Sequence, residues 1–133
     1  MSRENLEIAR RANVALNEGD WNTLLELFAP DVEWRDLMHA PDVPEVLHGL
    51  EELRPILSAW TEAYDEFRAE VIEFIDADPW VICDTRWTGT GKGSGAPVEV
   101  RSADAYELRD GKIVRSIGGC PDVDTAKELT GSA

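Results

Sequence analysis

The sequence predicts an α+β fold in which three helices and one early strand precede a run of antiparallel strands. Two observations support this class. Apolar side chains recur at the three- and four-residue spacing of helices through most of the first 65 residues. From residue 67 the spacing changes to two, and turn residues separate the runs, as in strands. The 133 residues suit one domain, 1–133, and 43% of them are hydrophobic, enough for a core without a metal or disulfide.

Helices are predicted at about residues 3–17, 21–28 and 50–65, where the apolar side chains fall on one side of each helix. Between the first two, Gly19 ends one helix and Asp20 caps the next, which is the usual chemistry of helix ends.

The early strand is "VEWRD", residues 32–36. Alternation places Val32, Trp34 and Asp36 on one side of it. The following segment, 37–48, contains two prolines and both histidines and predicts a loop.

Four further strands are predicted in the second half, at residues 67–76, 80–90, 98–109 and 112–119. The glycine-rich segment "GKGSGAP" between the second and third of these lacks the spacing of a phosphate-binding loop, so we interpret it as a hairpin connection.

The last hairpin has a strong turn signal, Asp110–Gly111. If these are its two loop residues, the residues on either side of them pair. Counting back predicts Tyr106 opposite Arg115 and Asp104 opposite Ile117.

Two aspartates share a strand face with large apolar residues. Asp36 lies with Val32 and Trp34, and Asp104 lies with Val100 and Tyr106. An unpaired carboxylate in an apolar site costs several kcal/mol when charged, so burial raises its pKa toward the range useful for acid–base chemistry. The alternative is that each aspartate turns to solvent or pairs with an arginine; the candidates are Arg35, Arg86, Arg101 and Arg115.

Three segments carry a family likeness: "ALNEGDWNTLLELFAPDVEW", "LHGLEELRPIL" and "ELRDGKIVRS". With them, the chain resembles a SnoaL-like member of the nuclear transport factor 2-like superfamily, which includes ketosteroid isomerases, polyketide cyclases and limonene-epoxide hydrolases. The resemblance implies a cystatin-like cone, in which a curved antiparallel sheet wraps around the N-terminal helices and encloses a pocket. It also implies a homodimer formed through the outer face of the sheet.

The resemblance assigns roles to single residues. Asp36 falls where ketosteroid isomerases carry their catalytic base, and Asp104 falls where they carry the protonated aspartate of the oxyanion hole. The isomerase tyrosine of the first helix is matched by Ala12, a departure from that pattern. The epoxide-hydrolase arrangement of an arginine between two acids has only loose candidates, Arg101 and Arg115.

The candidate site therefore has Asp36 and Asp104 as catalytic residues. Trp34 and Trp60 are predicted pocket walls, because aromatic side chains suit a flat apolar ligand. The full set of predicted ligand-binding residues is Ala12, Leu16, Trp34, Trp60, Val100, Tyr106 and Arg115.

Three functions remain open from the sequence. The first is a cofactor-independent isomerase, cyclase or lyase that acts beside a carbonyl, with Asp36 abstracting a proton and Asp104 donating a hydrogen bond to the enolate. The second is a non-catalytic binder of a small hydrophobic molecule, and the third is a dimeric scaffold. No cofactor is expected. His39 and His48 could join Asp36 or Asp42 as metal ligands, but loop histidines are more often solvated, and no metal is predicted.

The charge and hydropathy of the chain indicate which partners and which cellular location to expect. The net charge of −14 disfavours nucleic acid and anionic membrane surfaces. The charged N-terminus is unlike a signal peptide, and no window reaches the ~18 apolar residues of a membrane span, so a cytoplasmic location is expected. A homodimer is predicted because the outer sheet face was expected to expose Val81, Cys83, Trp87 and Val114.

Overall fold

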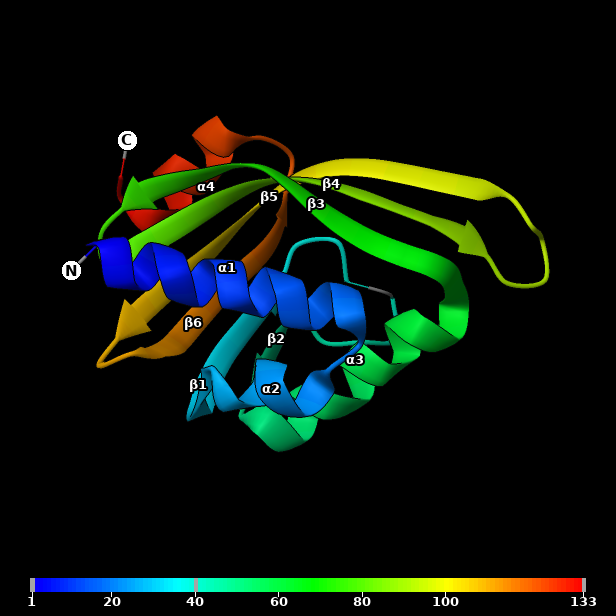
Figure 1. Cartoon of the computed structure of the whole chain (residues 1–133), viewed down its shortest axis with the longest axis horizontal. Coiled ribbons are helices and arrows are strands. Elements are labelled where there is room, and N and C mark those ends of the chain that lie inside the picture. The colour runs from blue at the N-terminus through cyan, green and yellow to red at the C-terminus, as the bar shows by residue number, and fades with distance from the viewer. Residues whose placement is uncertain (1, 40, 133) are drawn as a thin grey trace.

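In the computed structural model, helices cover both faces of a curved six-stranded sheet (Figure 1). The structure describes residues 2–39 and 41–132. The predicted α+β class is confirmed. The elements are α1 Ser2–Glu18, α2 Trp21–Glu26, β1 Phe28–Asp36, β2 Val46–His48, α3 Leu50–Ala63, β3 Tyr64–Ala77, β4 Trp80–Gly91, β5 Pro97–Arg109, β6 Lys112–Cys120 and α4 Val123–Thr130.

The strands are ordered β2-β1-β6-β5-β4-β3, and every pair is antiparallel except β1 and β6, which run parallel. The prediction of a purely antiparallel sheet is therefore wrong at this one pair. The pairing has a functional consequence, because it sets Asp36 at the end of β1 in register with Gly118 of β6.

The main core lies between the concave face of the sheet and the first three helices. Ile8 and Ala12 of α1 and Leu57 of α3 are buried there, against Val81 and Cys83 of β4. Burial of such side chains provides most of the folding free energy, at roughly 25 cal/mol per Å² of apolar area.

A fourth helix, α4, covers the convex face and was not predicted. Asp122 caps it by accepting a hydrogen bond from the backbone N–H of Thr125 at 2.7 Å, and Gly131 ends it with a positive φ of 73°. Its one fully buried residue, Ala126, packs in a second apolar cluster with Trp80 and Ile82. A helix of eight residues with so little buried surface leaves almost no periodic signal in the sequence.

Two local predictions near β1 also need correction. Phe28 was placed in the second helix, but it begins β1. The preceding carbonyl, that of Leu27, accepts a hydrogen bond from the N–H of Ile113 of β6. In addition, the segment predicted to be a loop contains the short strand Val46–His48.

Three of the four residues predicted to form a dimer interface, Val81, Cys83 and Trp87, do not lie on the outer face. Val81 and Cys83 are 0% and 3% exposed and belong to the concave core, and Trp87 packs against the same core. Val114 is half-buried. Cys83 pairs directly with Asp104, so all these β4 residues share the face that Asp104 occupies.

The convex face beyond α4 is charged instead. Arg86 pairs with Glu70 and Glu99, and Arg101 pairs with Asp84. The dimer stays a prediction, but the apolar interface on which it was based is absent from the described residues.

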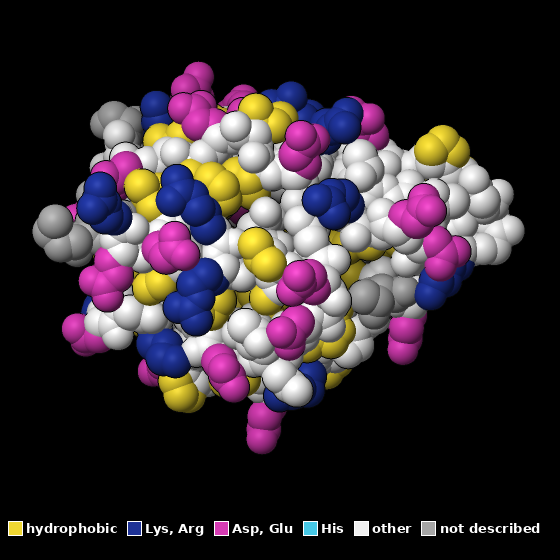
Figure 2. Space-filling view, viewed as in Figure 1, with side chains coloured by type: hydrophobic (Ala, Val, Ile, Leu, Met, Phe, Trp, Pro, Cys, Tyr) yellow, Lys and Arg dark blue, Asp and Glu magenta, His cyan; other side chains and the backbone are white. Residues whose placement is uncertain are grey.

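On the face seen in Figure 2, charged side chains of both signs are scattered, with hydrophobic ones visible between them. Within the described part of the chain, no helix combines the length and the apolar character needed to cross a membrane.

Candidate functional site

A cavity of about 220 Å³ lies between α1, α3 and the concave face of the sheet. Every residue that was predicted for the site lines this cavity except Arg115. These are Ala12, Leu16, Trp34, Asp36, Trp60, Val100, Asp104 and Tyr106. Further lining residues that sequence reasoning did not single out include Met38, Tyr64, Phe67, Ser102, Ser116, Gly118 and Gly119.

Arg115 lies on the opposite face of the sheet. The tight turn was predicted correctly, and Arg109 pairs with Lys112. A register shift between Glu107 and Leu108 then moves the pairing by one residue, so that Arg115 lies opposite Glu107. A slip of one residue exchanges the two faces of a strand.

On that convex face Arg115 has partners of its own. Its Nε donates to Glu107 Oε1 at 2.6 Å, and its guanidinium lies 5.1 Å from the centre of the Trp80 ring. The hydrogen bond to Glu107 raises the pKa of Arg115. Ser116 takes the place opposite Tyr106 that was predicted for Arg115.

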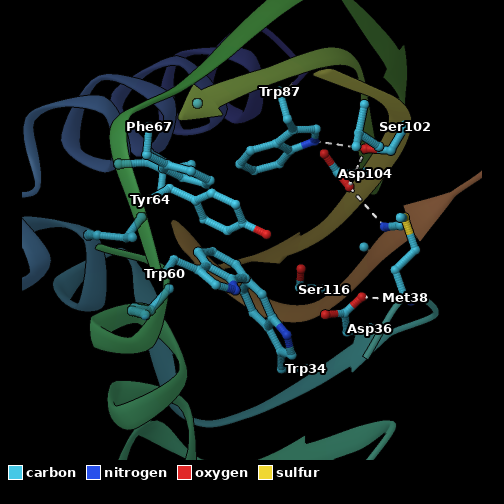
Figure 3. Close-up of a pocket in the computed structure, with 18 of the residues that line it drawn as sticks. Trp34, Asp36, Met38, Trp60, Tyr64, Phe67, Trp87, Ser102, Asp104 and Ser116 are labelled. Atoms are coloured by element: carbon cyan, nitrogen blue, oxygen red, sulfur yellow. Dashed lines mark hydrogen bonds between the residues drawn. The ribbon is translucent and has the colours of Figure 1, made fainter. Parts of the chain in front are cut away.

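Asp36 is held at the end of β1 by the turn that follows. Its Oδ1 accepts a hydrogen bond from the backbone N–H of Met38 at 2.8 Å (Figure 3). The side chain is half-buried, and it lies at the same end of the cavity as Asp104 and Ser116. This anchor orients the carboxylate.

Asp104 lies in the middle of β5 and is 8% exposed. Its Oδ1 accepts a hydrogen bond from the Gly119 N–H at 3.0 Å and a weak one from the Ser102 hydroxyl at 3.4 Å. Ser102 in turn accepts from the indole N–H of Trp87 at 2.8 Å. Because an indole nitrogen only donates, the Ser102 hydrogen is left to point at Asp104.

Burial decides the protonation of Asp104. Loss of solvation raises its pKa to about 6, although the hydrogen bond from Gly119 acts in the opposite direction, and the negative charge of Asp36 adds a smaller upward effect. Asp104 therefore changes charge close to neutral pH, which is the range where a general acid is useful.

The backbone of β6 passes between the two aspartates at Gly118–Gly119. A Cβ on Gly118 would lie 3.6 Å from Asp104 Oδ1. A Cβ on Gly119 would lie 2.9 Å from Met38 Cγ and 3.2 Å from Asp36 Oδ1. A glycine pair at the end of a strand is compatible with such a close approach, but it does not indicate which residues approach.

Gly119→Ala is expected to destabilise the protein and disturb Asp36. The residue has a φ of +75°, which costs about 1 kcal/mol for a side chain, and the crowding against Met38 adds to that cost. Gly111→Ala is the matched control, because Gly111 has a φ of +77° but nothing within 4 Å of its Cβ. Urea unfolding of both variants should show the larger loss at Gly119. Equal losses would mean that the site is not crowded.

The other end of the cavity is a wall of aromatic rings (Figure 3). Trp60 of α3 lies at the centre of it, with its ring centre 6.0 Å from Trp34, 5.9 Å from Phe67 and 6.1 Å from Trp87. Tyr64 stacks on Phe67 at 6.2 Å with an interplanar angle of 28°. Such a wall suits a flat apolar molecule.

A bulge in β3 turns Tyr64 and Phe67 to the same side. Residues three apart in a regular strand point to opposite faces, but the register shifts between Asp65 and Arg68, where Glu66 has a φ of 55°. Gly89 of β4 makes room for the bulge, since a Cβ there would lie 3.4 Å from Tyr64 Cβ. Nothing in the sequence predicted this feature.

The cavity contains carboxylates but no basic side chain among its described lining residues. The arginines that were candidate partners of the two aspartates pair with other carboxylates instead: Arg35 with Glu45, Arg86 with Glu70, Arg101 with Asp84 and Arg115 with Glu107. Among the described ion pairs, therefore, none joins one of these arginines to Asp36 or Asp104.

No histidine or cysteine is among the described residues that line the cavity. The His39 ring nitrogen Nδ1 is 2.7 Å from the carbonyl oxygen of Val43. The described residues contain no group of three or more His, Cys, Asp or Glu placed to hold a metal ion. Burial raises the pKa of the Cys83 thiol, and raises that of Cys120 to about 11.

Comparison with solved structures gives the same fold. A protein with a ketosteroid isomerase-like fold from Catenulispora acidiphila DSM 44928, in complex with trimethylamine, is 19% identical with a TM-score of 0.75, and covers 94% of this chain and 92% of that one. TerC, co-crystallised with polyporic acid, is 20% identical with a TM-score of 0.78, covering 96% and 98%. A candidate polyketide cyclase from Xanthomonas campestris pv. campestris is 20% identical with a TM-score of 0.71, covering 87% and 89%. At these identities the likeness is one of fold.

A search of curated proteins found no match. The model of the SnoaL-like domain matches residues 9–116, which include both aspartates, the aromatic wall and most of the sheet. The chain belongs to the family of SnoaL-like domains.

Proposed function

We propose that the protein is a cofactor-independent isomerase, cyclase or lyase that moves a proton beside a carbonyl of a hydrophobic small molecule. The observation that carries the proposal is the pair of aspartates at one end of an aromatic cavity. One is half-buried and the other almost fully buried. Two carboxyl groups in different environments can divide the roles of base and acid.

Asp36 is proposed as the base. One oxygen is held by the Met38 N–H, and the carboxylate takes a proton from the carbon next to the ligand carbonyl. As that C–H bond breaks, its electron pair moves into the new C=C bond and the carbonyl oxygen becomes an enolate oxygen. Return of the proton to another carbon gives an isomer. In a cyclase, the enolate carbon instead attacks a second carbonyl, whose π bond breaks to give an alkoxide, and this oxygen takes the proton back from Asp36.

Asp104 is proposed as the hydrogen-bond donor to the enolate oxygen. Its Oδ1 is occupied by the Gly119 N–H, so the proton of the neutral form belongs on Oδ2. A bound apolar ligand removes water from the cavity and raises the pKa of Asp104 further, which favours this neutral form.

The ligand is proposed to be flat and uncharged. The aromatic wall favours a flat molecule, while a carboxylate on the ligand would meet Asp36 and Asp104 without a basic partner. Two neighbours in fold support a small-molecule role for such a cavity: TerC was co-crystallised with polyporic acid, and another neighbour is a candidate polyketide cyclase.

The pH dependence of catalysis should report Asp104. Since its pKa is about 6 in the free protein, kcat/KM should fall as pH rises above about 6, by tenfold per pH unit at the limit. The Asp104→Asn variant cannot ionise, so its lower activity should lack this limb. Rates measured between pH 5 and pH 8 check this, and an unchanged limb in the variant would assign it to another group.

Deuterium exchange tests the proposed chemistry most directly. Flat ketones, such as steroid enones and aromatic polyketides, are incubated in D₂O with and without protein, and the label beside the carbonyl is followed by mass spectrometry. Faster exchange with the protein supports an enzyme. A ketone that binds in the cavity yet exchanges only at the background rate would support a non-catalytic binder, which Ala12 in place of the isomerase tyrosine also favours.

A further inference from the structure

The indole nitrogen of Trp34 is a buried donor with nothing to bond to. Among the described residues it is the one buried side-chain nitrogen or oxygen without a hydrogen-bond partner. Trp34 is 8% exposed and lines the cavity. A buried donor without an acceptor destabilises a protein, so such a group in a cavity calls for an explanation.

The Trp34 ring is packed in the main apolar core, where it contacts two other aromatic rings. Its edge meets Phe28, with ring centres 6.0 Å apart at 70°, and its face is tilted against Trp60 at 6.0 Å. The nitrogen is closed to solvent. No hydrogen bond to a described residue has to be broken when this N–H meets an acceptor.

The neighbouring polar groups do not accept a hydrogen bond from the Trp34 N–H. Asp36, two residues along the same face of β1, accepts from the Met38 N–H and not from Trp34. The contrast with Trp87 is informative, because the Trp87 N–H donates to Ser102 and is thereby tied to the protein. Three tryptophans line the cavity, Trp34, Trp60 and Trp87, and among the described residues Trp34 is the one whose indole nitrogen is buried without a partner.

We infer that the Trp34 N–H binds an oxygen of the ligand and positions it beside Asp36. The acceptor is an uncharged carbonyl or ether oxygen, because a carboxylate would be repelled by Asp36 and Asp104. The donor is neutral, so it can hold this oxygen throughout the reaction without changing its own charge. This inference rests on the proposed function only in taking the same cavity as the ligand site.

A thermodynamic cycle with two ligands tests this inference. The pair is 2-acetonaphthone and 2-isopropenylnaphthalene, which have the same shape but differ by O against CH₂. Affinities are measured by calorimetry for the wild type and for Trp34→Phe, which keeps an aromatic ring and removes the N–H. The variant should bind the ketone about 5- to 10-fold more weakly relative to the alkene, the usual effect of one hydrogen bond.

Trp60→Phe is the matched control, since it shortens a ring of the same wall. It should change the two affinities by similar factors. Equal binding of ketone and alkene by the wild type would overturn the inference, and so would a ketone preference that survives in Trp34→Phe.

A second measurement does not depend on the stability of the variant. The wild type has five indole N–H signals in a nitrogen-15 NMR spectrum, one for each tryptophan. Ketone binding should move the Trp34 signal downfield and alkene binding should not. Neither experiment measures turnover. If the Trp34 N–H does not bind the ligand oxygen, the proposed proton transfer is unaffected. If deuterium exchange is not accelerated, the result on ligand binding by Trp34 is unaffected.

Discussion

Asp36→Asn is expected to lower turnover by about 10² or more while ligand affinity stays close to that of the wild type. Asparagine has the same shape, and its amide oxygen can still accept the Met38 N–H, so the turn after β1 should keep its conformation. What is lost is the ability to accept a proton. The effect should therefore appear in kcat and in the rate of deuterium exchange.

The matched control is Asp42→Asn, which makes the same chemical change in an exposed residue of the loop after β1. It should leave exchange unchanged. An Asp36→Asn protein that binds the ketone and exchanges it at the wild-type rate would remove Asp36 from the base role. Asp104 would then be the next candidate, since it is the other carboxylate of the cavity.

Asp104→Asn is expected to stabilise the protein at high pH. The pKa of Asp104 is about 6 in the folded state, against 3.8 for an aspartate that is not buried. The folded wild type holds this proton more tightly than the unfolded chain does, so the wild type loses stability as pH rises from about 4 through 6. A pKa difference of this size corresponds to about 3 kcal/mol once the group is fully ionised. Asparagine does not ionise and should escape that loss.

Urea unfolding of both proteins between pH 4 and pH 8 measures this effect. The difference in unfolding free energy, variant minus wild type, should increase with pH by up to about 3 kcal/mol, and most of the increase should fall between about pH 4 and pH 6. Asp42→Asn again serves as the control, because it makes the same chemical change in an exposed residue. A constant difference for Asp104→Asn would mean that its carboxylate is not destabilised by burial. An increase would indicate that the site is maintained at the expense of stability.

The pairing of aspartates with apolar neighbours could be predicted because it needs only alternation along a strand. Trp34 with Asp36, and Tyr106 with Asp104, share a face in any regular strand, and all four line the cavity. The α+β class followed equally from the change of hydrophobic period. These inferences depend on local geometry alone.

The predictions that were wrong have a common physical cause. A local sequence pattern does not determine how segments far apart in the chain are placed relative to one another. Alternation placed Val81, Cys83 and Trp87 on one face, but it could not say that this face is concave. Arg115 was assigned to the cavity by counting from a correct turn, and one bulge reversed it. The passage of Gly118–Gly119 between the aspartates depends on the parallel pairing of β1 with β6, about 80 residues apart, which no local pattern contains.

The bulge at Glu66 helps to shape the cavity, and it lies on a different strand from the two aspartates. The carboxylates come from β1 and β5, whereas Tyr64 and Phe67 come from β3, at the edge of the sheet. An edge strand has one neighbour, so an insertion or deletion at this bulge disturbs a single pairing. Glu66 itself is exposed. Changes in the length of β3 can therefore alter which ligands bind while Asp36 and Asp104 remain in place. A library of one-residue insertions and deletions at residues 65–67 should yield variants that bind a different range of ligands.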